Sequence, residues 1–471
     1  MGKDLVLVTG ATGYIASRLI PQLLERGYRV RCLIRQSLRI KARAWFPYVE
    51  VVLGDVMEPS TLEPAMQDVH TAYYLIHNMS SGRGYTSLEA TCARNFVSAA
   101  EAAGVKQIIY LSGLADPHGK IAAHMRSRIE TGDALREGNI PVTEFRAGVI
   151  VGPGSISFEM IRFMTELMPI IFGPLWLQNQ SQPIAVQNVI EYLLAALENK
   201  SGQHQVFEIG GPDRMSYADL MLTYGRLSGR SRRSVTVPGM PLWFMVMGVA
   251  WMTPVPASIA RPLVDGMRSD SLVQDESAGR TYPDIRLIGY EEAVKIALDQ
   301  LHPIRLEPVW RDCDQLVKFI KHEGFFIDHR CETVQAPPEK VFRVITDLGG
   351  VDGWLYANWL WMLRGWLDRF LDGPGMRGRL NKMSVGSVVD FYRVEALEKN
   401  QLLRLYSELK APGEGWMEWR VESVDGVTKL SQTGFFTPRG FLGFAYWYGL
   451  SVFHRMVFRG LIKAIARKSE A

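Results

Sequence analysis

The sequence predicts an α/β chain in which a doubly wound parallel sheet is followed by a separate α+β domain. Residues 5–146 alternate short β-branched runs with helical segments, which is the pattern of a parallel sheet with helices on both faces. Beyond residue 325 the chain changes to long aromatic-rich strands closed by one helix. The 471 residues also exceed the roughly 250–300 that one hydrophobic core holds, so several domains are expected.

The first domain is expected to cover residues 1–325. Its predicted strands are Leu5–Thr9, Arg29–Ile34, Val49–Leu53, Thr71–Leu75, Gln107–Leu111 and Val142–Arg146. The intervening helices each end at or near a glycine, which is a helix stop signal, and they are Ile15–Arg26, Leu88–Ala103 and Ile121–Arg136. Residues 147–325 are less regular, with proline-rich loops and two evident helices, Tyr217–Leu227 and Glu291–Leu301.

The second domain is expected to cover residues 326–471. Its predicted strands lie between Gly, Pro and Asn turns and are Val385–Val394, Leu402–Leu409, Gly415–Val424 and Thr428–Phe436. A final helix is expected within Gly440–Lys468.

A glycine-rich loop follows the first predicted strand and opens the first helix. The loop reads Thr9-Gly10-Ala11-Thr12-Gly13-Tyr14-Ile15-Ala16. Gly10 allows a tight turn, Gly13 lets backbone N–H groups approach a pyrophosphate, and the helix dipole from Tyr14 onward favours the anion. The strand before the loop and the helix after it are the context that this motif needs. The pattern indicates a dinucleotide-binding, Rossmann-type domain in which Gly10, Thr12, Gly13, Tyr14 and Ile15 contact the cofactor.

The end of the second predicted strand indicates which dinucleotide is bound. Arg35 stands where an acidic residue would bind the ribose hydroxyls of NAD. Because an arginine pairs with a 2′-phosphate, we expect NADP(H), with Arg31 and Arg39 as possible reinforcement. A solvated loop arginine is the alternative. After the third strand, Asp55 and Val56 are expected beside the adenine, unless Asp55 only caps a helix that begins near Ser60.

These motifs resemble the atypical and extended short-chain dehydrogenase/reductases, especially the NmrA-like branch. The resemblance covers about residues 1–325 and rests on TGATGYIA, VRCLIR, LGDV, YLSG at Tyr110–Gly113, FRAGVIVGPGS at Phe145–Ser155 and PIAVQNVIEYLLAAL at Pro183–Leu197. It implies an NADP(H)-binding fold in which residues 147–325 cover the substrate. It says much less about the reaction.

The catalytic tyrosine and lysine of the best-known members, a YxxxK pair, are missing from this chain. The corresponding segment places His124 and Arg128 four residues apart, on one helical face. His124 is therefore a candidate proton donor, Arg128 a candidate ribose contact, and Ser112 a candidate for orienting a carbonyl. The alternative is a surface helix whose two side chains contact only cofactor or water. His77 borders the same expected cleft, although a loop histidine with ordinary partners is the simpler interpretation.

The segment from Cys331 is similar to the opening of START-like, or SRPBCC-like, helix-grip domains. It reads as a strand, a Pro-Pro helix start and a helix that ends in glycine. The resemblance implies a curved antiparallel sheet that grips a long C-terminal helix. Aromatic residues crowd the domain and suit either an apolar cavity for a hydrophobic small molecule or a filled core.

Composition excludes some partners and leaves others open. A net charge of +4 is too small to imply nucleic acid, and no His/Cys/Asp cluster has metal-ligand spacing. The four cysteines show no spacing typical of a disulfide framework, and no secretory signal is evident, so a cytoplasmic location is expected. The runs Val235–Ala260 and Phe441–Ala466 are too interrupted to span a bilayer, and they suit helices that are buried or that lie peripherally on a membrane.

Two functions fit these observations. The first is an NADPH-dependent oxidoreductase that acts on an apolar carbonyl or unsaturated substrate. The second is a catalytically silent NADP(H)-binding redox sensor or assembly factor, which the missing tyrosine and lysine favour. The oligomeric state stays open.

Overall fold

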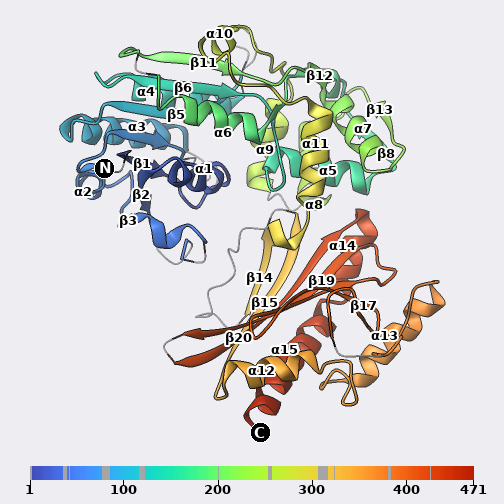
Figure 1. The fold of residues 1–471 in the computed structure, drawn as a ribbon. Coiled ribbons are helices and arrows are strands. Elements are labelled where there is room, and N and C mark those ends of the chain that lie inside the picture. The colour runs from blue at the N-terminus through green and yellow to red at the C-terminus, as the bar shows by residue number, and fades with distance from the viewer. Residues whose placement is uncertain are drawn as a thin grey trace. The chain divides into compact units, whose positions relative to one another are not determined.

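The chain folds into two compact units, Met1–Gln300 and Leu301–Ala471. The computed structural model describes residues 3–35, 40–41, 43–76, 85–115, 122–199, 201–252, 257–305, 317–322, 324–379, 383–424 and 426–471. Figure 1 shows both units.

The first unit is built on a seven-stranded parallel sheet in the order β11-β6-β5-β4-β1-β2-β3. Its strands are β1 (Lys3–Thr9), β2 (Tyr28–Ile34), β3 (Glu50–Leu53), β4 (Thr71–Tyr74), β5 (Gln107–Gly113), β6 (Val142–Ala147) and β11 (Gln205–Ile209). The chain leaves β1 toward β2 on one side and returns to β4 on the other. This reversal is the switch point at which such sheets bind ligands. The doubly wound sheet and six of its strands are therefore confirmed.

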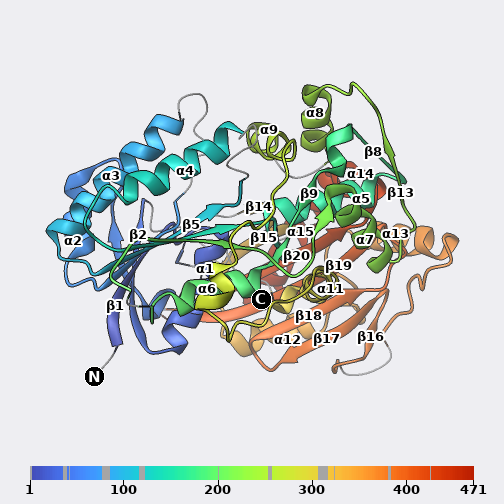
Figure 2. The same ribbon diagram turned by 90° about the horizontal axis from the view of Figure 1, so that it is seen from above.

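Helices cover both faces of this sheet (Figure 2). One face carries α1 (Tyr14–Glu25) and α6 (Val186–Ala195), whose leucine, isoleucine and valine side chains join the core of β1 and β2. The other face carries α2 (Leu62–Met66), α3 (Tyr85–Ala102) and α4 (Ala123–Leu135). The strands are buried from both sides, which explains their nearly continuous apolar sequences.

The rest of the first unit forms a smaller layer around the carboxyl ends of the strands. Its helices are α5 (Ile156–Leu167), α7 (Tyr217–Leu227), α8 (Leu242–Met252), α9 (Ala257–Gly266), α10 (Ser277–Thr281) and α11 (Tyr290–Asp299). Short strand pairs join it, namely β7 (Ile150–Val151) with β10 (Ile184–Ala185), β8 (Ile170–Gly173) with β13 (Arg233–Thr236), and β9 (Gln180–Ser181) with β12 (Met215–Ser216). Helix α7 has the bounds that the sequence predicted, and α11 corresponds to the predicted helix Glu291–Leu301 with slightly different ends.

The second unit is a seven-stranded antiparallel sheet in the order β14-β15-β20-β19-β18-β17-β16. Its strands are β14 (Val317–His322), β15 (Phe325–Val334), β16 (Val388–Val389), β17 (Tyr392–Glu398), β18 (Leu402–Ser407), β19 (Gly413–Val424) and β20 (Val427–Pro438). Its helices are α12 (Pro338–Thr346), α13 (Asn358–Phe370), α14 (Gly440–Gly449) and α15 (Ser451–Glu470). Helix α15 packs on the sheet through Val457, Leu461, Ile462 and Ile465. None of the helices in the described part of the chain combines the length and the apolar character of a bilayer span.

Three details differ from the sequence expectations. The expected boundary at residues 325/326 falls within β15, whereas contacts divide the chain at residues 300/301, because β14 pairs with β15. The single helix expected over residues 440–468 is broken at Leu450 into α14 and α15. Cys331 is disulfide-bonded although the cysteine spacing is not typical of a disulfide framework, because sequence spacing does not report distance in space. Cys32 and Cys92 are buried and take no part in a disulfide.

Candidate active site

The turn between β1 and α1 requires glycine for two physical reasons. Gly10 has a φ of +66°, which side-chain-bearing residues rarely adopt. A Cβ atom at this position would also lie 2.5 Å from the carbonyl oxygen of Leu75, at the end of β4. The hydroxyl of Thr9 ties the same strand ends together, since it donates to Tyr73 O and accepts from Leu75 N–H, both at 3.0 Å. The loop is therefore pressed against the switch point of the sheet.

The start of α1 offers an anion-binding surface. Gly13 is the N-cap, and no side chain makes a cap hydrogen bond to the first turn. The backbone N–H groups of Tyr14, Ile15 and Ala16 have no acceptor within the helix, as in every first turn, and no acidic residue stands there. The residues present therefore fit a dinucleotide pyrophosphate. Ala16 is buried in the core beneath, as a small residue between helix and strand must be.

Arg35 and Asp55 lie together at the carboxyl ends of β2 and β3. The guanidinium of Arg35 is 74% exposed, and its Nη1 lies 3.9 Å from Asp55 Oδ2. The other carboxylate oxygen of Asp55 accepts the backbone N–H of Met57 at 3.0 Å, so Asp55 forms a local turn. It does not cap the 3-10 helix Pro59–Thr61 around Ser60, because Glu58 is the N-cap of that helix and no side chain makes a cap hydrogen bond there. Arg35 is thus available to a phosphate from solvent.

Other residues expected near the adenosine have different roles or lie outside the described residues. Arg31 is not available to a 2′-phosphate, because it is bound to Glu50 at 2.7 Å and to the carbonyl oxygens of Ala65 and Gln67. The expectation that Arg31 reinforces Arg35 is therefore wrong. Val56 is buried in the core on the α3 side of the sheet. Arg39 and His77 lie outside the described residues.

One cavity of about 320 Å³ is lined by two of the predicted cofactor-binding residues and by all three predicted catalytic residues. Tyr14 and Ile15 line it from the start of α1, and Ser112, His124 and Arg128 line it from the end of β5 and from α4. Thr12 is exposed on the loop, and Arg35 and Asp55 are not part of this cavity. This separation suits an extended dinucleotide, with its adenosine over β2 and β3 and its reactive end over β5.

His124 is buried within the cavity wall. It is 5% exposed, and its Nδ1 has no hydrogen-bond partner among the described residues. Gly266, at the end of α9, covers the imidazole so closely that a Cβ there would lie 2.9 Å from His124 Cε1. Burial and, second, the positive charge of Arg128 lower the pKa of His124 to about 4. The imidazole is therefore neutral at neutral pH, which weighs against His124 as a proton donor.

Ser112 and Arg128 occupy the same side of the cavity. Ser112 is 3% exposed at the end of β5. The hydroxyl of Tyr110 on the same strand donates to the backbone carbonyl of Arg128 at 3.1 Å, which fixes α4 against the sheet. Met125 packs over Gly113, where a Cβ would lie 2.7 Å from the methionine methyl group. The side chains of this wall are therefore held by close packing.

The opposite wall was not predicted residue by residue. It is apolar and rich in methionine, and it is contributed by α5, α7, α8 and the α9 segment, with Met160, Met164, Met221, Met245, Met267, Val249 and Leu263. The apolar run Val235–Ala260 was the available signal, since it contains α8. The outer face of α8 is exposed at Trp243, Phe244 and Met247. Asp270 is the carboxylate on the wall, and its Oδ1 accepts the N–H of Gln180 at 2.7 Å.

The second unit contains a cavity of its own, of about 280 Å³, between the sheet and its helices. Aromatic side chains line much of it, and Arg364 and His454 supply polar groups. Burial and, second, Arg364 lower the pKa of His454 to about 4. Beside this cavity Trp354 and Trp361 stack at 4.5 Å, so the aromatic residues both fill a core and enclose a space. No group of three or more metal-ligating side chains occurs within the described residues of either unit.

Two families match parts of the chain. Residues 10–133 match the family described as NAD(P)H-binding. The first unit contains an NAD(P)H-binding domain. Residues 323–461 match a family described as a protein of unknown function, DUF2867, so the similarity of the second unit to START-like domains stays a prediction.

Curated relatives match about half of this chain. The photosystem II assembly factor Ycf39 of Cyanophora paradoxa is 26% identical over 245 residues, which cover 50% of this chain and 71% of that protein. An NAD(P)H azoreductase of Xenophilus azovorans is 23% identical over 245 residues, which cover 50% of this chain and 77% of the azoreductase. This chain is therefore similar both to a protein named as an assembly factor and to one named as a reductase.

Solved structures share the fold of the NAD(P)H-binding domain. A triphenylmethane reductase of Citrobacter sp. complexed with NADP(H) has a TM-score of 0.51 and 21% identity, over 62% of this chain and 99% of that one. An NADPH-dependent quinone oxidoreductase of Escherichia coli complexed with NADPH has a TM-score of 0.51 and 19% identity, over 62% and 98% of the two chains. At this identity the likeness shows the fold alone.

Proposed function

We propose that this protein is an NADPH-dependent reductase of apolar carbonyl or unsaturated compounds. The observation that carries the proposal is the shared cavity, which is lined by the start of α1 and by Ser112, His124 and Arg128. A substrate in this cavity would lie against the reactive end of a dinucleotide whose pyrophosphate rests on α1. When bound, NADPH supplies a hydride.

The two ends of the site select the cofactor and the substrate. Arg35 pairs with the 2′-phosphate, which supports NADPH over NADH. The methionine-rich wall offers an adaptable apolar surface, which favours flat or bulky apolar acceptors. The similarity to a protein named as an NAD(P)H azoreductase supports a reductase role.

The polar wall stabilises charge that develops on the substrate. A neutral His124 can still donate one N–H hydrogen bond to an acceptor oxygen, and Arg128 lies one helical turn away on the same wall. Because the histidine stays neutral, the final proton comes from water. Ser112 orients the acceptor from the end of β5.

Steady-state kinetics with a panel of apolar quinones, enones and ketones test the proposal. Arg128→Gln is expected to lower turnover about 100-fold, as removal of a donor to a developing oxyanion does. Arg126→Gln is the matched control, because Arg126 is exposed on the same helix. His124→Ala should lower turnover while NADPH binding is preserved. Unchanged turnover in both His124→Ala and Arg128→Gln would contradict the proposal.

A non-catalytic role is the second candidate. Two observations favour it, namely the missing tyrosine and lysine pair and the low pKa of His124, which removes it as a proton donor. The similarity to proteins named as photosystem II assembly factors adds support. Tight NADPH binding with no oxidation by any acceptor, together with an NADPH-dependent change in proteolysis of the first unit, would select this role.

A further inference from the structure

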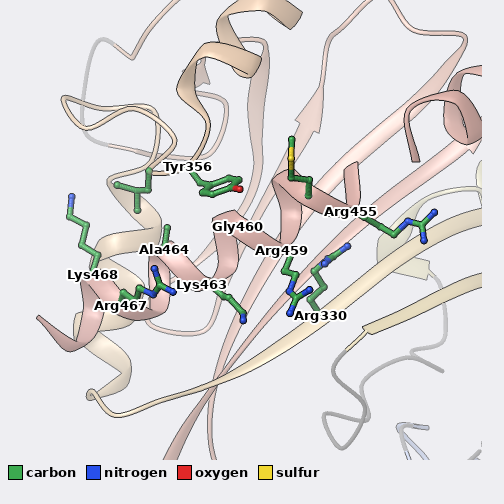
Figure 3. Close-up of a pocket in the computed structure, with 11 residues that line it drawn as sticks. Arg330, Tyr356, Arg455, Arg459, Gly460, Lys463, Ala464, Arg467 and Lys468 are labelled. Carbon is green, nitrogen blue, oxygen red and sulfur yellow. The ribbon is translucent and has the colours of Figure 1, made fainter. Parts of the chain in front are cut away.

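A basic groove runs along α15 in the second unit. Its volume is about 990 Å³ (Figure 3). Arg455, Arg459, Lys463 and Arg467 follow one another at intervals of four residues and therefore form a single stripe along the helix. Arg330 on β15 joins them, and Figure 3 shows Arg330, Arg459 and Lys463 reaching toward the same side of α15.

This groove carries more positive charge than its neighbours neutralise. Arg330 is paired with Asp328 through two hydrogen bonds of 2.8 Å, and Lys468 is paired with Asp352. Arg459, Lys463 and Arg467 form no ion pair with any described residue. Like charges at intervals of four residues repel each other, so an anion that enters the groove would stabilise this face.

Tyr356 forms one wall of the groove. Tyr356 lies over Gly460, and a Cβ at residue 460 would lie 2.1 Å from the tyrosine ring. Glycine at this position therefore lets Tyr356 rest directly on the helix backbone. The wall continues into α13, because the indole N–H of Trp361 donates to the carbonyl oxygen of Tyr356 at 3.1 Å.

Helix α13 exposes an apolar face next to this wall. The buried residues Trp361, Gly365 and Asp368 attach the helix to the unit. The opposite face consists of large exposed side chains spaced three or four residues apart, which are Trp359, Met362, Leu363, Trp366, Leu367 and Phe370. Trp366 is 65% exposed and Phe370 is 79% exposed. Such a continuous exposed face on a folded domain marks an interaction site.

The occupant must satisfy both the apolar face and the basic groove. Leu363 and Leu367 of α13 and Phe453 of α15 line the aromatic cavity of the second unit, so the two helices are neighbours. A second copy of the chain would bring the unpaired cations of two grooves close together. An anionic bilayer supplies phosphates for the groove and an apolar layer for tryptophan, leucine and phenylalanine side chains.

We propose that α13 and the basic groove of α15 bind the surface of an anionic phospholipid membrane. The apolar face of α13 enters the boundary between headgroups and acyl chains, and Arg459, Lys463 and Arg467 hold lipid phosphates. This docking does not depend on the reaction in the first unit.

Vesicle flotation of the full chain tests the proposal. The chain should float with vesicles in which about a third of the phosphatidylcholine is replaced by phosphatidylglycerol, and much less with phosphatidylcholine alone. The triple variant Arg459→Gln, Lys463→Gln and Arg467→Gln should bind about 100-fold more weakly. The matched control is Lys340→Gln, Arg343→Gln and Lys399→Gln, which removes three exposed charges of the same unit and should bind nearly as wild type.

A second pair of variants separates the membrane from other occupants. Trp366→Gln with Phe370→Gln should abolish flotation while circular dichroism stays unchanged, because both side chains are exposed. If this variant floats normally and inorganic phosphate displaces the vesicles, the groove is only a phosphate site and the proposal is wrong. If it instead converts a dimer to a monomer in sedimentation, the α13 face joins two copies and the proposal is equally wrong.

Discussion

The guanidinium of Arg35 lies 3.9 Å from the carboxylate of Asp55, across the carboxyl ends of the neighbouring strands β2 and β3. This pair is accessible to solvent, so a 2′-phosphate can take the place of the carboxylate as the partner of Arg35. The structure thereby places a positive charge at the end of the sheet where the adenosine half of a dinucleotide would lie.

Arg35→Ser should weaken NADPH binding about 10–100-fold, because a charge-assisted contact to phosphate is lost. NADH binding should change little. Calorimetric titration with both nucleotides measures the difference. Arg26→Ser is the control, since Arg26 is exposed in the same unit and, among the described residues, its guanidinium bonds only Gln22. Equal losses of affinity for NADPH and NADH would show that Arg35 does not bind the 2′-phosphate.

Gly10→Ala should destabilise the first unit by about 2 kcal/mol or more and prevent nucleotide binding. The new Cβ would combine an unfavourable φ with a collision at Leu75 O. Gly27→Ala separates the two effects, because Gly27 also has a positive φ but has open space around it. Its cost should be only about 1 kcal/mol. Urea unfolding followed by circular dichroism gives both values, and equal costs would rule out the collision.

Gly266→Ala should push the His124 imidazole out of its place. The Cβ would lie 2.9 Å from Cε1 and 3.3 Å from Nε2. A stability loss of about 1–3 kcal/mol is expected from this overpacking, although alanine normally favours a helix over glycine. Gly279→Ala in α10 has open space and should be neutral or stabilising. A gain of stability in Gly266→Ala would show that His124 can move freely.

His124 should make the first unit lose stability in mild acid. Its folded pKa of about 4 lies below the ordinary value of 6.5, so the unfolded chain binds the proton more readily. Its contribution is therefore fully present above about pH 6.5 and is lost as pH falls toward 4. The loss between pH 7 and pH 5 should be about 2 kcal/mol.

His124→Asn should remove this acid loss from the unfolding transition of the first unit only. His454→Asn should do the same for the second unit, because burial lowers the pKa of His454 to about 4 as well. Each variant is therefore the control for the other. If the first unit of His124→Asn still loses stability as the pH falls, groups other than His124 cause that loss.

The sequence by itself determined the repeating architecture. The strands and helices of the first sheet follow from periodic apolar runs and glycine stops, and the cofactor loop follows from Gly10 and Gly13 between a strand and a helix. These features are local, because each is decided by residues that are neighbours along the chain. The helix spacing of His124 and Arg128 was readable for the same reason.

Only the tertiary structure decided what surrounds these residues. The methionines of the apolar cavity wall come from α5, α7, α8 and the segment after α9, which are far apart in sequence, and no periodic pattern records that they meet. The neutral state of His124 depends on burial beneath Gly266, and the commitment of Arg31 to Glu50 depends on the pairing of β2 with β3. Charge and reactivity are set by neighbours in space, and folding brings those neighbours from distant parts of the chain.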